Sequence, residues 1–143
     1  MRTLQSLVSG RRLFSVSKEW TVFDVAQYMA EKRIGAVPVV DGKKIVGIFS
    51  ERDLMTRVVV PGLNPSMTPI ADVMTHQVAS CEPGETHVDG MRLMQQASCR
   101  HLPVVDQGHL VGFLSLRDLL QVEIDEKEDE LRHINNYVHS AGY

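Results

Sequence analysis

Two stretches decide the fold of this chain: residues 21–55, TVFDVAQYMAEKRIGAVPVVDGKKIVGIFSERDLM, and residues 86–120, THVDGMRLMQQASCRHLPVVDQGHLVGFLSLRDLL. A shift of 65 residues lays the first over the second without a gap, and thirteen of the 35 aligned positions are identical. The shared letters include the run PVVD and the pattern S-x-R-D-L, and their number is far above chance. The chain is therefore an internal duplication.

Each copy predicts the same series of elements. Apolar residues at helical spacing follow Thr21 and Thr86, which indicates a helix that begins after a threonine cap. The apolar runs AVPVV and HLPVV then lead through a turn into KIVGIF and HLVGFL, the pattern of a buried hairpin. A second helix begins at Ser50 or Ser115, and a short strand at 13–17 or 78–81 precedes the first helix. We therefore expect an α/β (α+β) fold of two pseudo-symmetric β-α-β-β-α repeats packed through their sheets.

The segments around the repeats give the expected boundaries. We expect an N-terminal lead helix over residues 1–12, a first repeat over 13–60, a linker over 61–77, a second repeat over 78–122 and a C-terminal helix over 123–143. The first fourteen residues carry three arginines and no acid, which also resembles a targeting segment. We favour a short helix with Leu4, Leu7 and Val8 on one face.

Composition excludes several classes of protein. The 143 residues carry a net charge of −3, which argues against a nucleic-acid partner, and no apolar run approaches the length of a membrane span. By default we expect a cytoplasmic protein. Cys81 and Cys99 align with Val16 and Ile34 of the first copy, so we expect buried small hydrophobic side chains rather than a metal or catalytic site.

The residues at each strand-to-helix junction suggest ligand chemistry. Ser50 and Asp53 lie there in the first copy, and a carboxylate can accept hydrogen bonds from both hydroxyls of a ribose. Arg52 and the first N–H groups of the helix can hold a phosphate. The same S-x-x-D spacing is also a capping box that needs no ligand.

Two details favour the ligand. An arginine at the second helical position is disfavoured by the helix dipole, yet it occurs in both copies. Gly47 and Gly112 would let a flat group approach the backbone.

The duplicated helix, the PVVD strand and the pattern G-h-h-S-x-R-D-L (h, apolar) resemble the pair of cystathionine-β-synthase-type (CBS) domains called a Bateman module, in its stand-alone bacterial form. The resemblance runs from Thr3 to Val122. It implies a non-catalytic regulatory module that binds AMP, ADP, ATP, S-adenosylmethionine or NAD(H), with no metal. It also implies a homodimer that reports energy or redox state to an effector protein.

The resemblance further implies two composite pockets, each built from both repeats. Adenine would lie among apolar side chains and be read by backbone groups near Val37 and Leu102. The expected ligand-binding residues are Ser50, Arg52, Asp53, Gln77, Val78, Ala79, Cys99 and Arg100 at one site, and Ser115, Arg117, Asp118, Arg12, Phe14, Ile34, Gly35 and Ala36 at the other. His101, at the centre of the cleft, and Val37 are also expected to bind the ligand.

The two pockets are not expected to be equal. Arg100 and His101 replace Gly35 and Ala36 of the first copy, which suggests that they serve phosphates in the cleft. Alternatively, Arg100 is a solvated surface residue and His101 a histidine at a strand edge. The remaining histidines lack ligand spacing and are expected at the surface; they are His76, His87, His109, His133 and His139.

Two other functions stay open at this point. An enzyme is disfavoured because the sequence has no phosphate-binding loop GxxxxGK[ST], no GxGxxG and no HExxH. A purely structural dimerisation module would retain the repeats with vestigial pockets. The C-terminal segment bears on dimerisation, since its apolar positions recur at steps of four and three residues, broken once by Lys127. We expect this stripe to pack on its own domain or on a dimer mate; it comprises Leu120, Ile124, Lys127, Leu131, Ile134 and Val138.

Overall fold

A computed structural model of the chain describes residues 1–140. In the first half, Thr21 caps the first long helix by accepting the N–H of Asp24 at 3.3 Å. That helix packs on a three-stranded sheet whose order is β1-β2-β3. The elements are β1 (Val16–Ser17), α2 (Val22–Lys32), β2 (Ala36–Asp41), β3 (Lys44–Ser50), α3 (Glu51–Leu54) and a π-helical turn, η1 (Met55–Val59).

The second half repeats this plan with a smaller sheet. Its elements are α4 (His87–Ala97), β4 (His101–Asp106), β5 (His109–Ser115) and α5 (Leu116–Ser140). The predicted strand at 78–81 is reduced to one parallel bridge between Cys81 and Val104. Cys81 still donates to the Pro103 carbonyl at 3.0 Å and accepts from Val105 at 2.8 Å, so the counterpart of β1 survives as a pair of hydrogen bonds.

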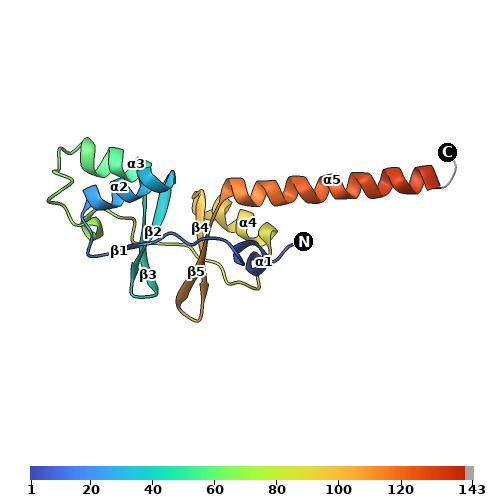
Figure 1. Ribbon diagram of the computed structural model, residues 1–143, viewed down its shortest axis with the longest axis horizontal. Helices are drawn as coiled ribbons and strands as arrows, with labels where there is room; N and C mark the ends of the chain where they lie inside the picture. Colours follow the sequence, from blue (N-terminus) through green and yellow to red (C-terminus); the bar gives the residue numbers. More distant parts are fainter. Residues whose placement is uncertain (141–143) are drawn as a thin grey trace.

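The two hairpins share their register. In both, the pairing slips by one residue between the two valines of the PVV run, that is, between Val39 and Val40 and between Val104 and Val105. Such a bulge twists the hairpin locally. The predicted α+β fold of two pseudo-symmetric repeats is thereby confirmed, with the β3 and β5 hairpin strands side by side in the middle of the molecule (Figure 1).

Each half has its own hydrophobic core, completed by a segment that precedes the other half. The short helix α1 (Leu4–Val8) is far from the second repeat in sequence, yet Leu4, Leu7 and Val8 are buried in the core of the second half. The linker, which includes η2 (Ile70–Asp72), inserts Ile70, Val73 and Met74 into the core of the first half. The expected lead helix is therefore present, but it belongs to the packing of the distant repeat.

This crossing explains the paired glycines. A Cβ on Gly47 would meet the Met74 side chain and would lie 2.9 Å from the Thr75 carbonyl oxygen, and a Cβ on Gly112 would overlap Val8. The prediction that these glycines admit a flat ligand is wrong, because segments of the chain itself occupy the space beside them.

Helix α5 leaves the body of the molecule after its first turns (Figure 1). Leu119 and Val122 near its start are buried, whereas Ile124, Leu131 and Ile134 are 51%, 60% and 58% exposed. Of the two expected alternatives for the apolar stripe, packing on its own domain is therefore wrong beyond Val122, and packing on a dimer mate stays a prediction. The last three residues of the expected helix over 123–143 lie outside the described residues. Within residues 1–140, no helix is long and apolar enough to cross a membrane.

Candidate functional site

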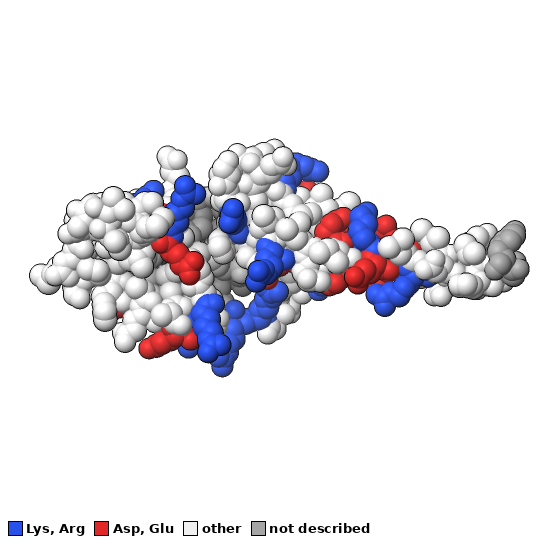
Figure 2. Space-filling model, turned by 90° about the horizontal axis from the view of Figure 1, so that it is seen from above, with Lys and Arg blue, Asp and Glu red and all other residues white. Residues whose placement is uncertain are grey.

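The larger of two clefts between the halves has a volume of about 540 Å³. One wall is the junction where β3 passes into α3, and the other is the chain before and after α4. Figure 2 shows basic side chains on both sides of the hollow between the halves. We call this the first cleft; it is lined by Gly35, Ala36, Ile48, Ser50, Glu51, Arg52, Asp53, Thr75, Gln77, Val78, Ala79, Ala97, Ser98, Cys99, Arg100 and His101.

Ser50 and Asp53 form a complete capping box at this junction. The Ser50 hydroxyl accepts the N–H of Asp53 at 3.1 Å, and Asp53 Oδ2 accepts the N–H of Ser50 at 3.0 Å. The capping interpretation of the motif is thus confirmed. The cap does not use every hydrogen-bonding position of the two side chains. Each hydroxyl and carboxylate oxygen offers two acceptor positions, so Ser50 Oγ and Asp53 Oδ1 keep capacity for a ligand. The cap holds the carboxylate in one orientation, which pre-organises it.

Two residues that the sequence did not single out support Asp53. The Thr75 hydroxyl lies 3.5 Å from Asp53 Oδ2. Arg57 Nε lies 3.7 Å from Asp53 Oδ1, and Arg57 Nη1 donates to the carbonyls of Val73 and Met74 at 3.2 and 3.1 Å. Arg57 therefore ties the carboxylate to the linker. The π-helical turn at Met55–Val59 carries this arginine.

Positive charge in the first cleft comes from Arg52 and Arg100. Both are exposed, and neither forms an ion pair within the described chain. The N–H of Glu51 donates to the Gly35 carbonyl at 2.9 Å, so this first helical N–H is not available to a phosphate. The two guanidinium groups are the side chains of this cleft whose charge and geometry suit a phosphate.

His101 lies between the clefts and lines both. Its ring stacks on Phe113, with 5.4 Å between centroids and 10° between planes. Burial lowers the pKa of His101, and the neighbouring Arg100 acts in the same direction while Asp118 opposes it. The imidazole is therefore neutral near pH 7, so it offers a flat face and a hydrogen-bonding nitrogen rather than a charge.

The second cleft is smaller, with a volume of about 200 Å³. Ser115 and Asp118 form its capping pair, at 2.8 and 3.1 Å, and Arg11 Nη1 lies 3.1 Å from Asp118 Oδ2. Burial raises the pKa of Asp118, but the Ser115 N–H and Arg11 outweigh it and hold the pKa below its ordinary value. The lining residues are Arg12, Leu13, Phe14, Ile34, Gly35, Ala36, His101, Phe113, Ser115 and Asp118.

The structure brings together most of the predicted site residues. All eight expected at the first site line the first cleft, and so does His101. Of those expected at the second, Arg117 lies outside the lining of both clefts described here. Val37, a residue of β2, is fully buried. Leu102, whose backbone was expected near adenine, is likewise fully buried.

The cysteines differ from one another. Cys81 is buried as predicted, and burial raises its pKa to about 12. Cys99 is only half-buried and faces the first cleft, and burial raises its pKa as well. Both are therefore thiols rather than thiolates at neutral pH.

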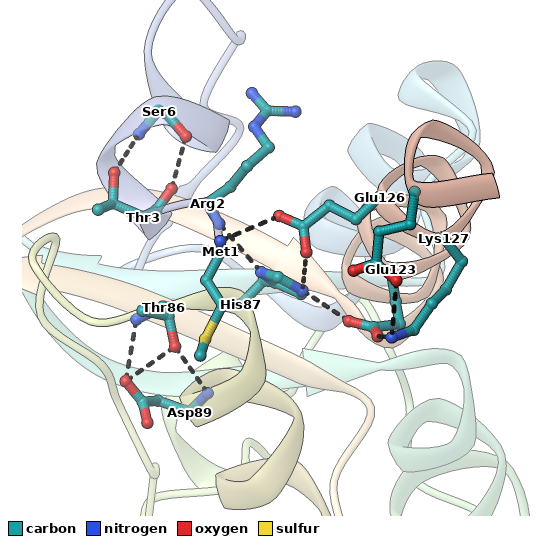
Figure 3. Close-up of polar contacts among 11 residues, drawn as sticks. Met1, Arg2, Thr3, Ser6, Thr86, His87, Asp89, Glu123, Glu126 and Lys127 are labelled. Carbon is teal, nitrogen blue, oxygen red and sulfur yellow. Dashed lines mark hydrogen bonds and ion pairs between the residues drawn. The ribbon is translucent and has the colours of Figure 1, made fainter. Parts of the chain in front are cut away.

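His87 was predicted at the surface and is instead fully buried, at the start of α4. Its Nε2 lies 2.8 Å from Glu123 Oε2 and 3.6 Å from Glu126 Oε2 on α5, as Figure 3 shows. The backbone N–H of Arg2 donates to His87 Nδ1 at 3.3 Å, so the ring proton is on Nε2, which donates to Glu123. The same hydrogen bond lowers the pKa of Glu123.

These three side chains also have the spacing of a metal-binding group, with their ligand atoms within 4.8 Å of one another. The tautomer does not fit that role. A ligating imidazole nitrogen must lose its proton, and the other nitrogen then donates to an acceptor. In this structure the other nitrogen faces a backbone donor, so His87 fastens α5 to α4 instead.

Comparison with protein-family models finds the CBS domain twice, at residues 8–60 and 70–125. Among curated proteins, the chain is 35% identical to the CBS domain-containing protein YhcV of Bacillus subtilis over 105 residues, which cover 73% of this chain and 74% of that protein. It is 29% identical to the mitochondrial CBS domain-containing protein CBSX3 of Arabidopsis thaliana, and the match covers 86% of this chain and 62% of that protein.

Solved structures share the fold. A protein with CBS domains from Burkholderia ambifaria superposes with a TM-score of 0.80 at 36% identity, over 87% of this chain and 95% of that one. The CBS domain protein PAE2072 from Pyrobaculum aerophilum, complexed with AMP, superposes with a TM-score of 0.72 at 27% identity, over 82% of this chain and 89% of that one.

Proposed function

This chain belongs to the CBS-domain family, with two copies of the domain in tandem, and on that premise we propose that it is a regulatory module that binds an adenosine nucleotide in the first cleft. The observation that carries the proposal is the convergence of Ser50, Asp53 and two unpaired arginines on one cavity of about 540 Å³. Cavities that hold small ligands span roughly 300–1,000 Å³, so a nucleotide fits the available space.

The polar groups suit the parts of a nucleotide. Asp53 is the acceptor for ribose hydroxyls, and Ser50 and Thr75 add hydroxyl groups beside it. Arg52 and Arg100 are the groups that would hold phosphates, since a guanidinium can contact two phosphate oxygens at once. Apolar side chains for the base come from Ile48, Val78 and Ala79, together with Ala97 and Cys99.

A relative supports the ligand class. PAE2072, which shares the fold at 27% identity, was solved with AMP. AMP, ADP, ATP and NAD(H) share the adenosine group that Asp53 and the apolar wall would recognise. They differ in their phosphates, which Arg52 and Arg100 would distinguish.

We infer a regulatory rather than a catalytic role. The groups in the first cleft bind and orient, and His101 beside them is held against Phe113. Binding would act through association: a homodimer, which the exposed stripe of α5 supports, and an effector protein that reads the nucleotide state. A cytoplasmic location stays a prediction.

A thermal-shift series with adenosine, AMP, ADP, ATP, NAD(H) and S-adenosylmethionine tests the proposal. A ligand at 100 times its dissociation constant stabilises the native state by about 2.7 kcal/mol, which raises the midpoint by several degrees. GMP is the matched control for the base. No shift with any adenine compound would leave a structural dimerisation module, and turnover of ATP or NADH would indicate an enzyme.

A further inference from the structure

The carboxylate of the second cleft already has a cationic partner from the same chain. Arg11 Nη1 lies 3.1 Å from Asp118 Oδ2, and that oxygen also accepts the Ser115 N–H at 2.8 Å. An oxygen of a carboxylate offers two acceptor positions, so Oδ2 of Asp118 is fully used. A ribose that needs both oxygens of this carboxylate would have to displace the guanidinium.

The fold fixes Arg11 in this place. Val8, three residues before it, is buried against Gly112 in the core of the second half. The chain then turns through Gly10, whose φ of +77° is in the left-handed region, and the N–H of Arg11 donates to the Val8 carbonyl at 3.1 Å. The arginine therefore emerges from an anchored turn at the edge of the second cleft.

The carboxylate of the first cleft has a longer arginine contact, and that contact is on its other oxygen. The 65-residue shift places His76 at the position of Arg11. Beyond its cap, Oδ2 of Asp53 meets only the Thr75 hydroxyl at 3.5 Å. Arg57 is the arginine there; its Nε lies 3.7 Å from Asp53 Oδ1, and its Nη1 donates to the carbonyls of Val73 and Met74, so its charge is shared with the linker.

Larger side chains also leave less room for a ligand in the second cleft. Phe14 and Phe113 line the second cleft where the shift places Ala79 and Ile48 in the first, and the volumes are about 200 and 540 Å³.

We propose that Arg11 is a specificity-determining residue that reserves Asp118 as an internal partner and so limits the chain to one adenosine nucleotide, in the first cleft. This inference rests on the proposed function. It assigns Arg11 the role of a competitor for the ribose site, and not of a group that binds phosphate.

Calorimetric titration with AMP tests it. We expect one equivalent per chain for the wild type and for Arg92→Gln, an exposed arginine of α4 that serves as the control. Arg11→Gln should bind a second equivalent, and Arg11→Lys, which keeps the cation, should bind one. A second arm uses Asp53→Ala, which disables the first cleft: adding Arg11→Gln should raise the remaining AMP affinity about tenfold, the value of a charge-assisted hydrogen bond. Circular dichroism melts verify that each variant is folded.

The outcomes separate the two proposals. Two equivalents in the wild type, one equivalent in Arg11→Gln, or weaker AMP binding on adding Arg11→Gln to Asp53→Ala would each overturn the role of Arg11 and leave the proposed function standing. No binding of any adenine nucleotide by the wild type would overturn both.

Discussion

Asp53 combines two roles in one side chain. It accepts the Ser50 N–H as a helix cap, and it lines the first cleft. A cap alone would explain the motif, as the sequence allowed. The convergence of Thr75, Arg52 and Arg100 on the same cavity requires the fold, because these residues are brought together from three different segments.

Asp53→Ala should weaken AMP binding by about tenfold to a hundredfold, because each charge-assisted hydrogen bond to a ribose contributes roughly 1.5–3 kcal/mol. Isothermal titration calorimetry measures this effect. Asp89→Ala is the matched control, since Asp89 closes the equivalent capping box with Thr86 on α4. Both variants should lose about 1 kcal/mol of stability from the cap. Equal AMP affinity in the two variants would remove Asp53 from the binding site.

Arg100 provides the second test at this scale. Arg100→Ala should weaken the binding of AMP much more than that of adenosine, and the difference should shrink as salt is raised from 50 to 500 mM, both chosen as test conditions. Arg100→Lys should recover only part of the loss, because an ammonium cannot make the bidentate contact. Arg92→Ala is the surface control. Equal losses for adenosine and AMP would place Arg100 in packing instead.

The burial of His87 could have been predicted from the alignment of the two repeats. The repeat aligns it with Val22, and both residues are fully buried. The same alignment correctly predicted a buried Cys81. The role of Arg11 could not be found in this way, because it depends on the packing of α1 against the distant repeat.

At the level of elements, the duplication predicted both hairpins and the helices that follow them. The strand predicted at 78–81 is too long, because only Cys81 pairs with β4. The sequence did not indicate where α1 and the linker pack. The boundaries of the five segments stay a prediction. The packing of α1 on the second half and of the linker on the first depends on tertiary contacts. In the sequence, these contacts are reflected at Gly47 and Gly112, which leave room for Met74 and Val8.

Gly112→Ala should lower the free energy of unfolding by about 1–3 kcal/mol, because its Cβ would overlap Val8. Adding Val8→Ala should make the loss smaller than the sum of the two single losses, since the partner of the overlap is then shortened. Urea denaturation measures these energies. Gly84→Ala is the control, because nothing lies within 4 Å of its added Cβ. Strict additivity in the cycle would mean that α1 does not pack on β5.

At the scale of the whole molecule, the duplication has become asymmetric. The two halves share register, caps and bulges, but the second adds α5 and binds its own carboxylate with Arg11. The long helix carries the exposed apolar stripe away from the rest of the molecule (Figure 1). We expect a second copy of the chain to pack on this stripe.

Light scattering should therefore give about twice the 16.0 kDa mass of the chain at tens of micromolar. Replacing Leu131 and Ile134 with glutamine should shift the protein toward the monomer, because both side chains are more than half exposed in the single chain. Asn136→Gln, on the same helix but off the stripe, should not. A wild-type monomer at this concentration would contradict the dimer.

The most direct test of the central claim is a crystal structure of the protein grown with AMP. We predict difference density for one nucleotide per chain, in the first cleft, with its ribose hydroxyls on Asp53 and its phosphate toward Arg52 and Arg100. Asp118 should remain paired with Arg11. Nucleotide density at Asp118 with the first cleft empty, or no density in either cleft at saturating AMP, would contradict the account.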